Sequence, residues 1–129
     1  MPTRRVLDIG QCDYDHGTIG DLLRAEFGAE VVRANSATEA LDRLQKESFD
    51  LVLVNRVFDR TAEEGLDLIR KAKADAKMSA TPVMLVSNYP QSQDEAVAAG
   101  AVPGFGKSSL TDGATKERLE KYLGGVAVS

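Results

Sequence analysis

The feature that most constrains the fold is a run of four aliphatic residues, Leu-Val-Leu-Val, at positions 51–54. Polar and apolar residues do not alternate in this run, which is typical of a strand buried on both faces, as in a parallel sheet covered by helices. The run ends at Asn55, which we expect at the carboxyl end of the strand. Binding sites in open α/β sheets form at the carboxyl ends of central strands. The run therefore predicts an α/β fold and makes Asn55 a candidate site residue.

The rest of the chain alternates between strand and helix patterns. The expected strands are 4–9, 30–34, 50–55, 82–87 and 101–106. The expected helices are 16–27, one after a capping box at Ser36 and Glu39, 65–76, 93–99 after a second capping box at Ser92 and Glu95, and 110–123. This alternation over short loops indicates one doubly wound domain spanning 1–129, with five parallel strands and five helices. We expect an ordered core from residue 4 to 123 and frayed residues at 124–129.

Composition limits the kinds of partner and compartment. Sixteen basic and 20 acidic residues give a formal net charge of −4, with the signs interspersed. Because a nucleic-acid binder favours a basic face, we expect no direct nucleic-acid contact. No apolar run approaches the ~20 residues that span a bilayer, and residues 1–7 lack the apolar stretch of a signal peptide. The single cysteine, Cys12, excludes an internal disulfide, so we expect a cytoplasmic protein.

The chain resembles a response-regulator receiver domain over nearly its whole length. The resemblance rests on the order of elements and on residues 49–54, 65–69, 81–83, 98–101 and Lys107. It implies a flavodoxin-like fold with strand order 2-1-3-4-5 and a role in two-component signalling or a phosphorelay. Members of this family accept a phosphoryl group on an Asp that ends the third strand. An acidic pair after the first strand holds Mg²⁺, and a hydroxyl residue and a Lys end the fourth and fifth strands.

Only part of that family site is retained in this chain. Ser87 matches the hydroxyl position, and Lys107 matches the lysine. The phosphoacceptor position falls on Asn55, and the acidic pair falls on Gly10 and Gln11. The resemblance therefore implies a site in which the acceptor and both metal-binding acids are replaced.

These replacements remove the chemistry of phosphorylation. Formation of an acyl phosphate needs a carboxylate nucleophile, whereas the amide of Asn55 is neutral and a poor nucleophile. Mg²⁺ needs hard oxygen ligands, generally including one or two carboxylates. The matching positions supply none, and Lys107 leaves them with a positive charge. We therefore expect no Mg²⁺ and no other cofactor. The charge of the pocket suits an anion, and the alternative left open is that Lys107 faces a partner or pairs with a neighbouring acid.

Two acids keep a phosphoacceptor function open as an alternative. Asp13 would lie at the tip of the first strand if that strand ran two residues longer than expected. Asp59 could turn into the site from the polar loop at 56–64. The first alternative is therefore a receiver that uses these non-standard acids as its acceptor and metal ligands.

A small-ligand or nucleotide-binding domain of flavodoxin-like fold is the second alternative. Residues 101–108 fit a loosened Walker A pattern with Ala in place of the first Gly, although few residues remain for the later strand that hydrolysis needs. Residues 13–20, which include His16, are similar to the cobalamin-binding pattern Asp-x-His-x-x-Gly, with both spacings off by one. We expect His16 to be a helix N-terminal residue and Cys12 to be an inert packing residue.

The sequence as a whole predicts a degenerate receiver, a pseudo-receiver that is not an enzyme and binds a protein partner independently of phosphorylation. The aromatic residue that reports phosphorylation in the family falls on Gly104, with Phe105 one place further along. The reporter is therefore lost together with the acceptor. The face that family members often use for partners would carry residues 91–97, Phe105 and the last helix. A homodimer is left open.

Overall fold

The computed structural model describes residues 3–124, and the expected frayed residues after Gly124 lie outside the described residues. The described residues form one parallel sheet in the order β2-β1-β3-β4-β5. Its strands are β1 (Arg5–Ile9), β2 (Glu30–Ala34), β3 (Leu51–Asn55), β4 (Val83–Val86) and β5 (Val102–Phe105). The helices are α1 (Asp13–Phe27), α2 (Ala37–Lys46), α3 (Gly65–Ala74), α4 (Pro90–Ala98) and α5 (Gly113–Leu123), with a short 3-10 helix, η1 (Lys107–Ser109). The predicted flavodoxin-like fold is confirmed.

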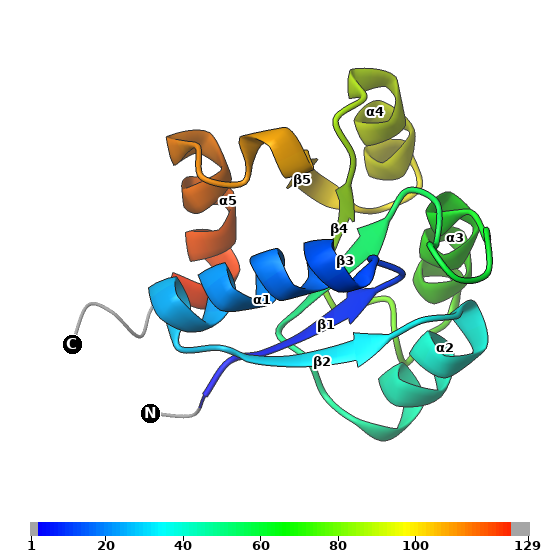
Figure 1. Ribbon diagram of the computed structural model, residues 1–129. Coiled ribbons are helices and arrows are strands. Elements are labelled where there is room, and N and C mark those ends of the chain that lie inside the picture. The colour runs from blue at the N-terminus through cyan, green and yellow to red at the C-terminus, as the bar shows by residue number, and fades with distance from the viewer. Residues whose placement is uncertain (1–2, 125–129) are drawn as a thin grey trace.

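The central strand β3 divides the core into two layers. All five of its residues are buried. Val52 and Val54 pack into the core beneath α2, α3 and α4, whereas Leu51 and Leu53 pack into the core beneath α1 and α5. The helices therefore cover both faces of the sheet (Figure 1). This explains why residues 51–54 are all apolar, and it brings Asn55 to the carboxyl edge of the sheet.

Helix starts were harder to predict than strands. The capping box before α2 is present, because the Glu39 N–H donates to Ser36 Oγ at 3.1 Å. Helix α1 begins at Asp13, three residues before the predicted start, with the thiol of Cys12 as its N-cap group. Gly28 ends α1 with φ of 62°, the left-handed conformation that glycine tolerates.

The predicted starts of the last two helices are wrong. Helix α4 begins at Pro90, so Ser92 and Glu95 lie inside the helix and form no capping box. Proline is favoured at the first helical position, where its missing N–H costs nothing. Helix α5 begins at Gly113 instead of residue 110, because residues 107–109 form the 3-10 turn first.

The side chain of Gln93 connects α4 to an irregular part of the sheet. The pairing between β4 and β5 shifts register between Met84 and Val86. Gln93 fills the irregularity, since its Nε2 donates to the carbonyl oxygens of Leu85 at 2.9 Å and Ser87 at 3.1 Å. Its Oε1 accepts from the N–H of Gly104 at 3.2 Å. One side chain thus satisfies backbone groups that regular strand pairing would otherwise have used.

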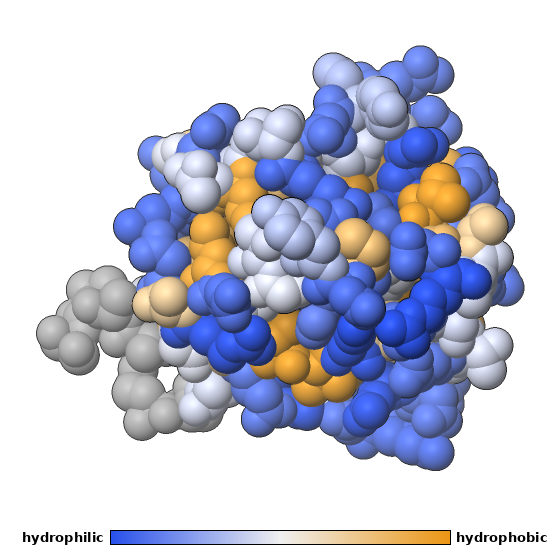
Figure 2. All heavy atoms as spheres, viewed as in Figure 1, coloured by the Kyte–Doolittle hydropathy of each residue, from blue (hydrophilic) through white to orange (hydrophobic). Residues whose placement is uncertain are grey.

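The visible face of the molecule is mostly hydrophilic (Figure 2). Apolar atoms come to the surface there in small, separate patches, near the junction of α1 with α5 and over β2. Within residues 3–124, no helix has the length and the apolar character that crossing a membrane requires.

Candidate functional site

Asn55 ends β3 and uses its side chain to hold two loops. Its Nδ2 donates to the carbonyl oxygen of Val57 at 2.7 Å and to that of Gly10 at 3.0 Å. The side chain is almost fully buried, with 9% of the residue exposed. Because both neighbours are acceptors, the position requires a side chain that donates, and an ionised carboxylate can only accept. Asn55 therefore serves as a structural donor at this position.

Gly10 lies opposite Asn55 and leaves no room for a side chain. Its φ is +80°, a conformation that strains other residues. A Cβ built there would lie 2.3 Å from Cδ1 of Phe58, which is 1% exposed. The N–H of Asp59, the next residue, donates to the Gly10 carbonyl oxygen at 2.9 Å. The loop after β3 is therefore packed directly against Gly10, the position that carries an acid in response-regulator receiver domains.

Gln11, the second position of the acidic pair, is 1% exposed. Neither its Oε1 nor its Nε2 has a hydrogen-bond partner among the described residues. A fully buried acid is present nearby in β1, at Asp8. Its Oδ2 lies 2.7 Å from Nδ1 of His16, in the first part of α1. Burial raises the pKa of Asp8, and the hydrogen bond to His16 acts in the opposite direction. Asp8 is thus hydrogen-bonded to helix α1 through the side chain of His16.

The two acids considered as substitutes lie outside the pocket. Strand β1 ends at Ile9, so the extension that would bring Asp13 to its tip does not occur. Asp13 begins α1 with its side chain 79% exposed, and its Oδ1 lies 2.8 Å from Arg33 and 3.1 Å from Arg60. Hydrogen bonds from these two arginines lower the pKa of Asp13. Asp59 is exposed and contacts Gly10 through its backbone.

Ser87 and Lys107 both lie near Asn55, and each already has a partner. Ser87 Oγ accepts from the N–H of Tyr89 at 3.1 Å. Lys107 Nζ lies 2.8 Å from Oδ2 of Asp15, which also accepts from the thiol of Cys12 at 3.3 Å. Partial burial opposes ionisation of Asp15, but the hydrogen bonds from Lys107 and Cys12 outweigh it and lower the pKa of this carboxyl. The charge of Lys107 is therefore largely balanced.

A pocket of about 260 Å³ opens between these groups. Its lining consists of Asn55, Arg56, Val57, Val86, Ser87, Asn88, Tyr89 and Lys107. The structure thus brings three of the predicted positions together, whereas Gly10 and Gln11 do not line the pocket. Across the described part of the chain, no three His, Cys, Asp or Glu side chains are grouped so that they could hold a metal ion. The donor set does not fit Mg²⁺.

Gly104, the predicted switch position, is held by neighbouring backbone. A Cβ there would lie 2.2 Å from the Leu85 carbonyl oxygen. Its own carbonyl oxygen accepts from Nη1 of Arg118 at 2.6 Å. Phe105 is 2% exposed and belongs to the core beneath α1 and α5. Gly104 therefore carries no ring, and the ring of Phe105 lies in the interior.

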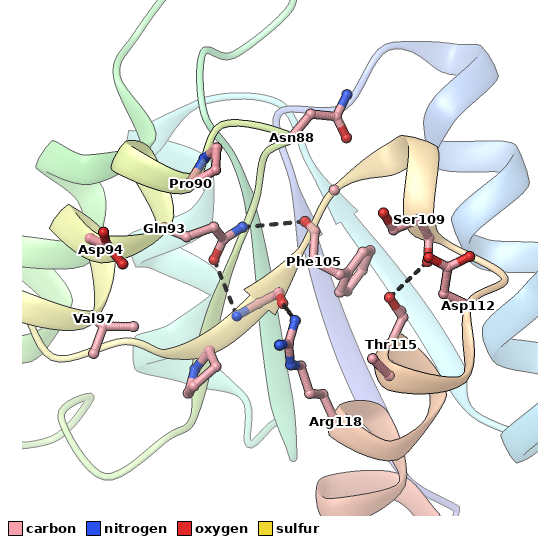
Figure 3. Close-up of a pocket in the computed structure, with 14 residues that line it drawn as sticks. Asn88, Pro90, Gln93, Asp94, Val97, Phe105, Ser109, Asp112, Thr115 and Arg118 are labelled. Carbon is pink, nitrogen blue, oxygen red and sulfur yellow. Dashed lines mark hydrogen bonds between the residues drawn. The ribbon is translucent and has the colours of Figure 1, made fainter.

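A larger cavity of about 650 Å³ lies between α4 and α5, over the edge strand β5. Figure 3 shows Gln93 extending from α4 and Arg118 from α5 toward the same segment of β5. Val97, on the α4 side, is 44% exposed. This cavity coincides with the partner face that the resemblance implied.

Sequence reasoning missed the roles of three residues that shape these sites. Phe58 is the lone aromatic residue in a polar loop, and that contrast was a signal for burial. Asp15 lies one helical turn after a cap position and becomes visible as a partner of Lys107 only in three dimensions. Gln93 gave no signal in the sequence, since its role depends on the register shift between β4 and β5.

Comparison with known proteins gave a sequence relative and similar structures. No protein-family model matches the chain. Chemotaxis protein CheY of Pseudomonas aeruginosa is 30% identical over 107 residues, which cover 81% of this chain and 84% of that protein.

Solved structures of response regulators share the fold. A response regulator receiver protein from Pseudomonas putida has a TM-score of 0.75 and 21% identity, covering 94% of this chain and 98% of that one. A response regulator from Burkholderia pseudomallei, solved with a phosphorylated aspartic acid, a calcium ion and citrate, has a TM-score of 0.69 and 21% identity. That match covers 95% of this chain and 75% of the other. At these identities, the likeness shows the fold.

Proposed function

This chain belongs to the receiver domains of response regulators, which act in signal transduction, and we propose that it is a pseudo-receiver that signals by binding a partner protein without being phosphorylated. The hydrogen bonding of Asn55 carries the proposal. Its amide donates to two carbonyl oxygens, at 2.7 and 3.0 Å. A phosphoacceptor needs a carboxylate that is free to attack, and this position binds its neighbours through N–H groups that no carboxylate has.

The environment of Gly10 supports the same proposal. Restoring an acid there requires both a strained φ and displacement of Phe58. The loss of the acceptor, the loss of the metal-binding acid and the packing of the following loop thus depend on one another. We propose that the domain uses no Mg²⁺ and catalyses no reaction.

The cavity between α4 and α5 supports a protein partner. It is bordered by apolar Val97 and Pro103, and by Asp94 and Asp112, for which no ion pair is found among the described residues. Arg118 is already bound to the Gly104 carbonyl oxygen, which leaves the acids as the more available charges. We propose this face, in the cytoplasm, as the contact surface for another signalling protein.

A receiver that uses Asp13 and Asp59 as non-standard acids is disfavoured by their positions. Asp13 is paired with two arginines at the surface, and its role as a nucleophile would require breaking both contacts. The small-ligand alternative is also disfavoured, because the key residues of its two motifs are bound to other side chains. Lys107 of the Walker-like segment lies in a 3-10 turn and pairs with Asp15, and His16 is bound through Nδ1 to Asp8.

Affinity capture with variants of this surface tests the interaction function. Val97→Glu places a charge in the α4–α5 cavity, and Gln45→Glu makes the matched change on exposed α2. We expect a partner that is retained by wild type and Gln45→Glu and lost with Val97→Glu, to the same extent with and without a phosphodonor. Capture that depends on the phosphodonor would contradict the proposal.

A further inference from the structure

We propose that the pocket at the ends of β3 and β4 binds a small tetrahedral oxyanion, such as phosphate, without a metal ion and without forming a covalent bond. The charge of the lining is the first argument. Arg56 and Lys107 both line the pocket, and none of its lining residues is acidic. Asp15 balances Lys107 from outside the lining, at 2.8 Å. The net positive charge of the pocket therefore comes from Arg56.

Arg56 is positioned to serve as the anchor of such a site. Its guanidinium lies over the ring of Tyr89, with Cζ 4.9 Å from the ring centroid. Arg56 also lines a neighbouring hollow that contains Glu64 and Glu95, but no carboxylate of the described residues forms an ion pair with it within 4 Å. The guanidinium is planar, and its fork of N–H groups matches the oxygens of phosphate; the contact with the Tyr89 ring restricts its orientation.

Two residues with uncharged donors, Ser87 and Asn88, line the same pocket. Ser87 Oγ accepts from the Tyr89 N–H through a lone pair, so its hydroxyl proton is available to a ligand. Asn88 Oδ1 accepts from both the N–H and the hydroxyl of Ser108, at 3.1 and 3.0 Å. This orients the amide and leaves Asn88 Nδ2 as a donor for which the described residues supply no partner. Cation, hydroxyl and amide together form a donor set that suits an anion.

The size of the pocket selects a small ligand. At about 260 Å³ it is smaller than the ~300–1,000 Å³ typical of sites for drug-sized molecules. A phosphate ion fits with its remaining waters, whereas a nucleotide would have to lie mostly outside. This inference does not depend on the partner-binding role, because the α4–α5 cavity shares only Asn88 with this pocket.

Titration of ¹⁵N-labelled protein with inorganic phosphate, at ionic strength held constant with sodium chloride, tests the site. We expect saturable shifts of the amide signals of Ser87, Asn88 and Tyr89. Arg56→Met removes the charge and keeps most of the stem, and we expect it to weaken phosphate binding at least about tenfold. Arg60→Met is the matched control, because Arg60 lies in the same loop but pairs with Asp13 outside the pocket.

Shifts that stay linear with phosphate concentration, or equal affinity in wild type and Arg56→Met, would overturn the proposal. A parallel titration with phenyl phosphate identifies the source of the anion. If phenyl phosphate binds more tightly than phosphate and also shifts the signals of Tyr89, the natural ligand is a phosphomonoester. If phenyl phosphate binds equally or more weakly than phosphate, the natural ligand is the free ion. Both of these outcomes support an oxyanion site.

Discussion

Asn55 and Gly10 are joined by a 3.0 Å hydrogen bond in which the side-chain amide of Asn55 donates to the Gly10 carbonyl oxygen. In the family pattern, these two positions carry carboxylates that cooperate around a metal ion. Here the two residues are hydrogen-bonded to each other, and the side chain of Phe58 packs against Gly10. Asn55 and Gly10, the positions matched to two of the family's acids, thus form a structural hydrogen bond in this protein.

Asn55→Asp is therefore expected to destabilise the fold instead of restoring a phosphorylation site. The new carboxylate would face the carbonyl oxygens of Gly10 and Val57 with no proton to donate. We expect a loss of about 2–4 kcal/mol in the free energy of unfolding, measured by urea denaturation at pH 7. Asn88→Asp makes the same change beside the same pocket, but Asn88 Oδ1 acts only as an acceptor, so this control should lose less than about 0.5 kcal/mol. Equal losses would contradict the account.

Gly10→Ala is expected to cost more than Gly28→Ala, although both glycines have positive φ. Gly28 has open space around its missing Cβ, so its substitution costs only backbone strain, about 1–2 kcal/mol. At Gly10, the Cβ also collides with Phe58, which adds about 1–3 kcal/mol. The difference between the two variants in urea denaturation measures how tightly Phe58 is packed. A cost at Gly10 no larger than at Gly28 would show that the loop after β3 moves aside freely.

His16→Ala is expected to destabilise the protein by about 2–3 kcal/mol, because it leaves the buried carboxylate of Asp8 without its partner. Asp8→Val in the same background should recover most of this loss, since replacing both partners of a buried polar contact by apolar residues costs little. The recovery is read as the coupling energy of a double-mutant cycle. Additive losses in the two single variants would mean that the contact contributes nothing.

The pairing of Asp15 with Lys107 predicts a specific dependence on pH. Because the pKa of Asp15 is lower in the folded than in the unfolded chain, the pair stabilises above the unfolded value of about 4, and this contribution is lost as pH falls through the folded value. Asp15→Asn should therefore cost about 0.5–1 kcal/mol at pH 7 and progressively less below pH 4. Urea denaturation across this range, with exposed Asp21→Asn as the control, measures the difference. A loss that is independent of pH would contradict the ion pair.

The apolar run of β3 and the alternation of strand and helix patterns around it predicted the fold class, because a strand buried on both faces needs helices on both sides of the sheet. The residues that decide the site were harder to predict. Asp8 interrupts an apolar strand, and such an acid needs a buried partner, but the sequence does not say that His16 supplies it. Phe58 was assigned to a polar loop, since local pattern carries no information about a contact with Gly10, which lies far away in sequence. Two signals also disagreed on where α4 begins: the helix starts at Pro90, and the capping-box pattern of Ser92 and Glu95 is not used.

The central claim is that this receiver pocket has lost its phosphorylation chemistry, and intact-mass spectrometry tests it most directly. Wild type and Asn55→Ala are incubated with a small-molecule acyl phosphate and Mg²⁺, with the Burkholderia pseudomallei response regulator, solved with a phosphorylated aspartic acid, as the positive control. We predict that the control gains the mass of one phosphoryl group and that neither form of this protein does. A stoichiometric phosphoryl gain on wild type, retained in Asn55→Ala, would show that another acid accepts phosphate and would contradict the account.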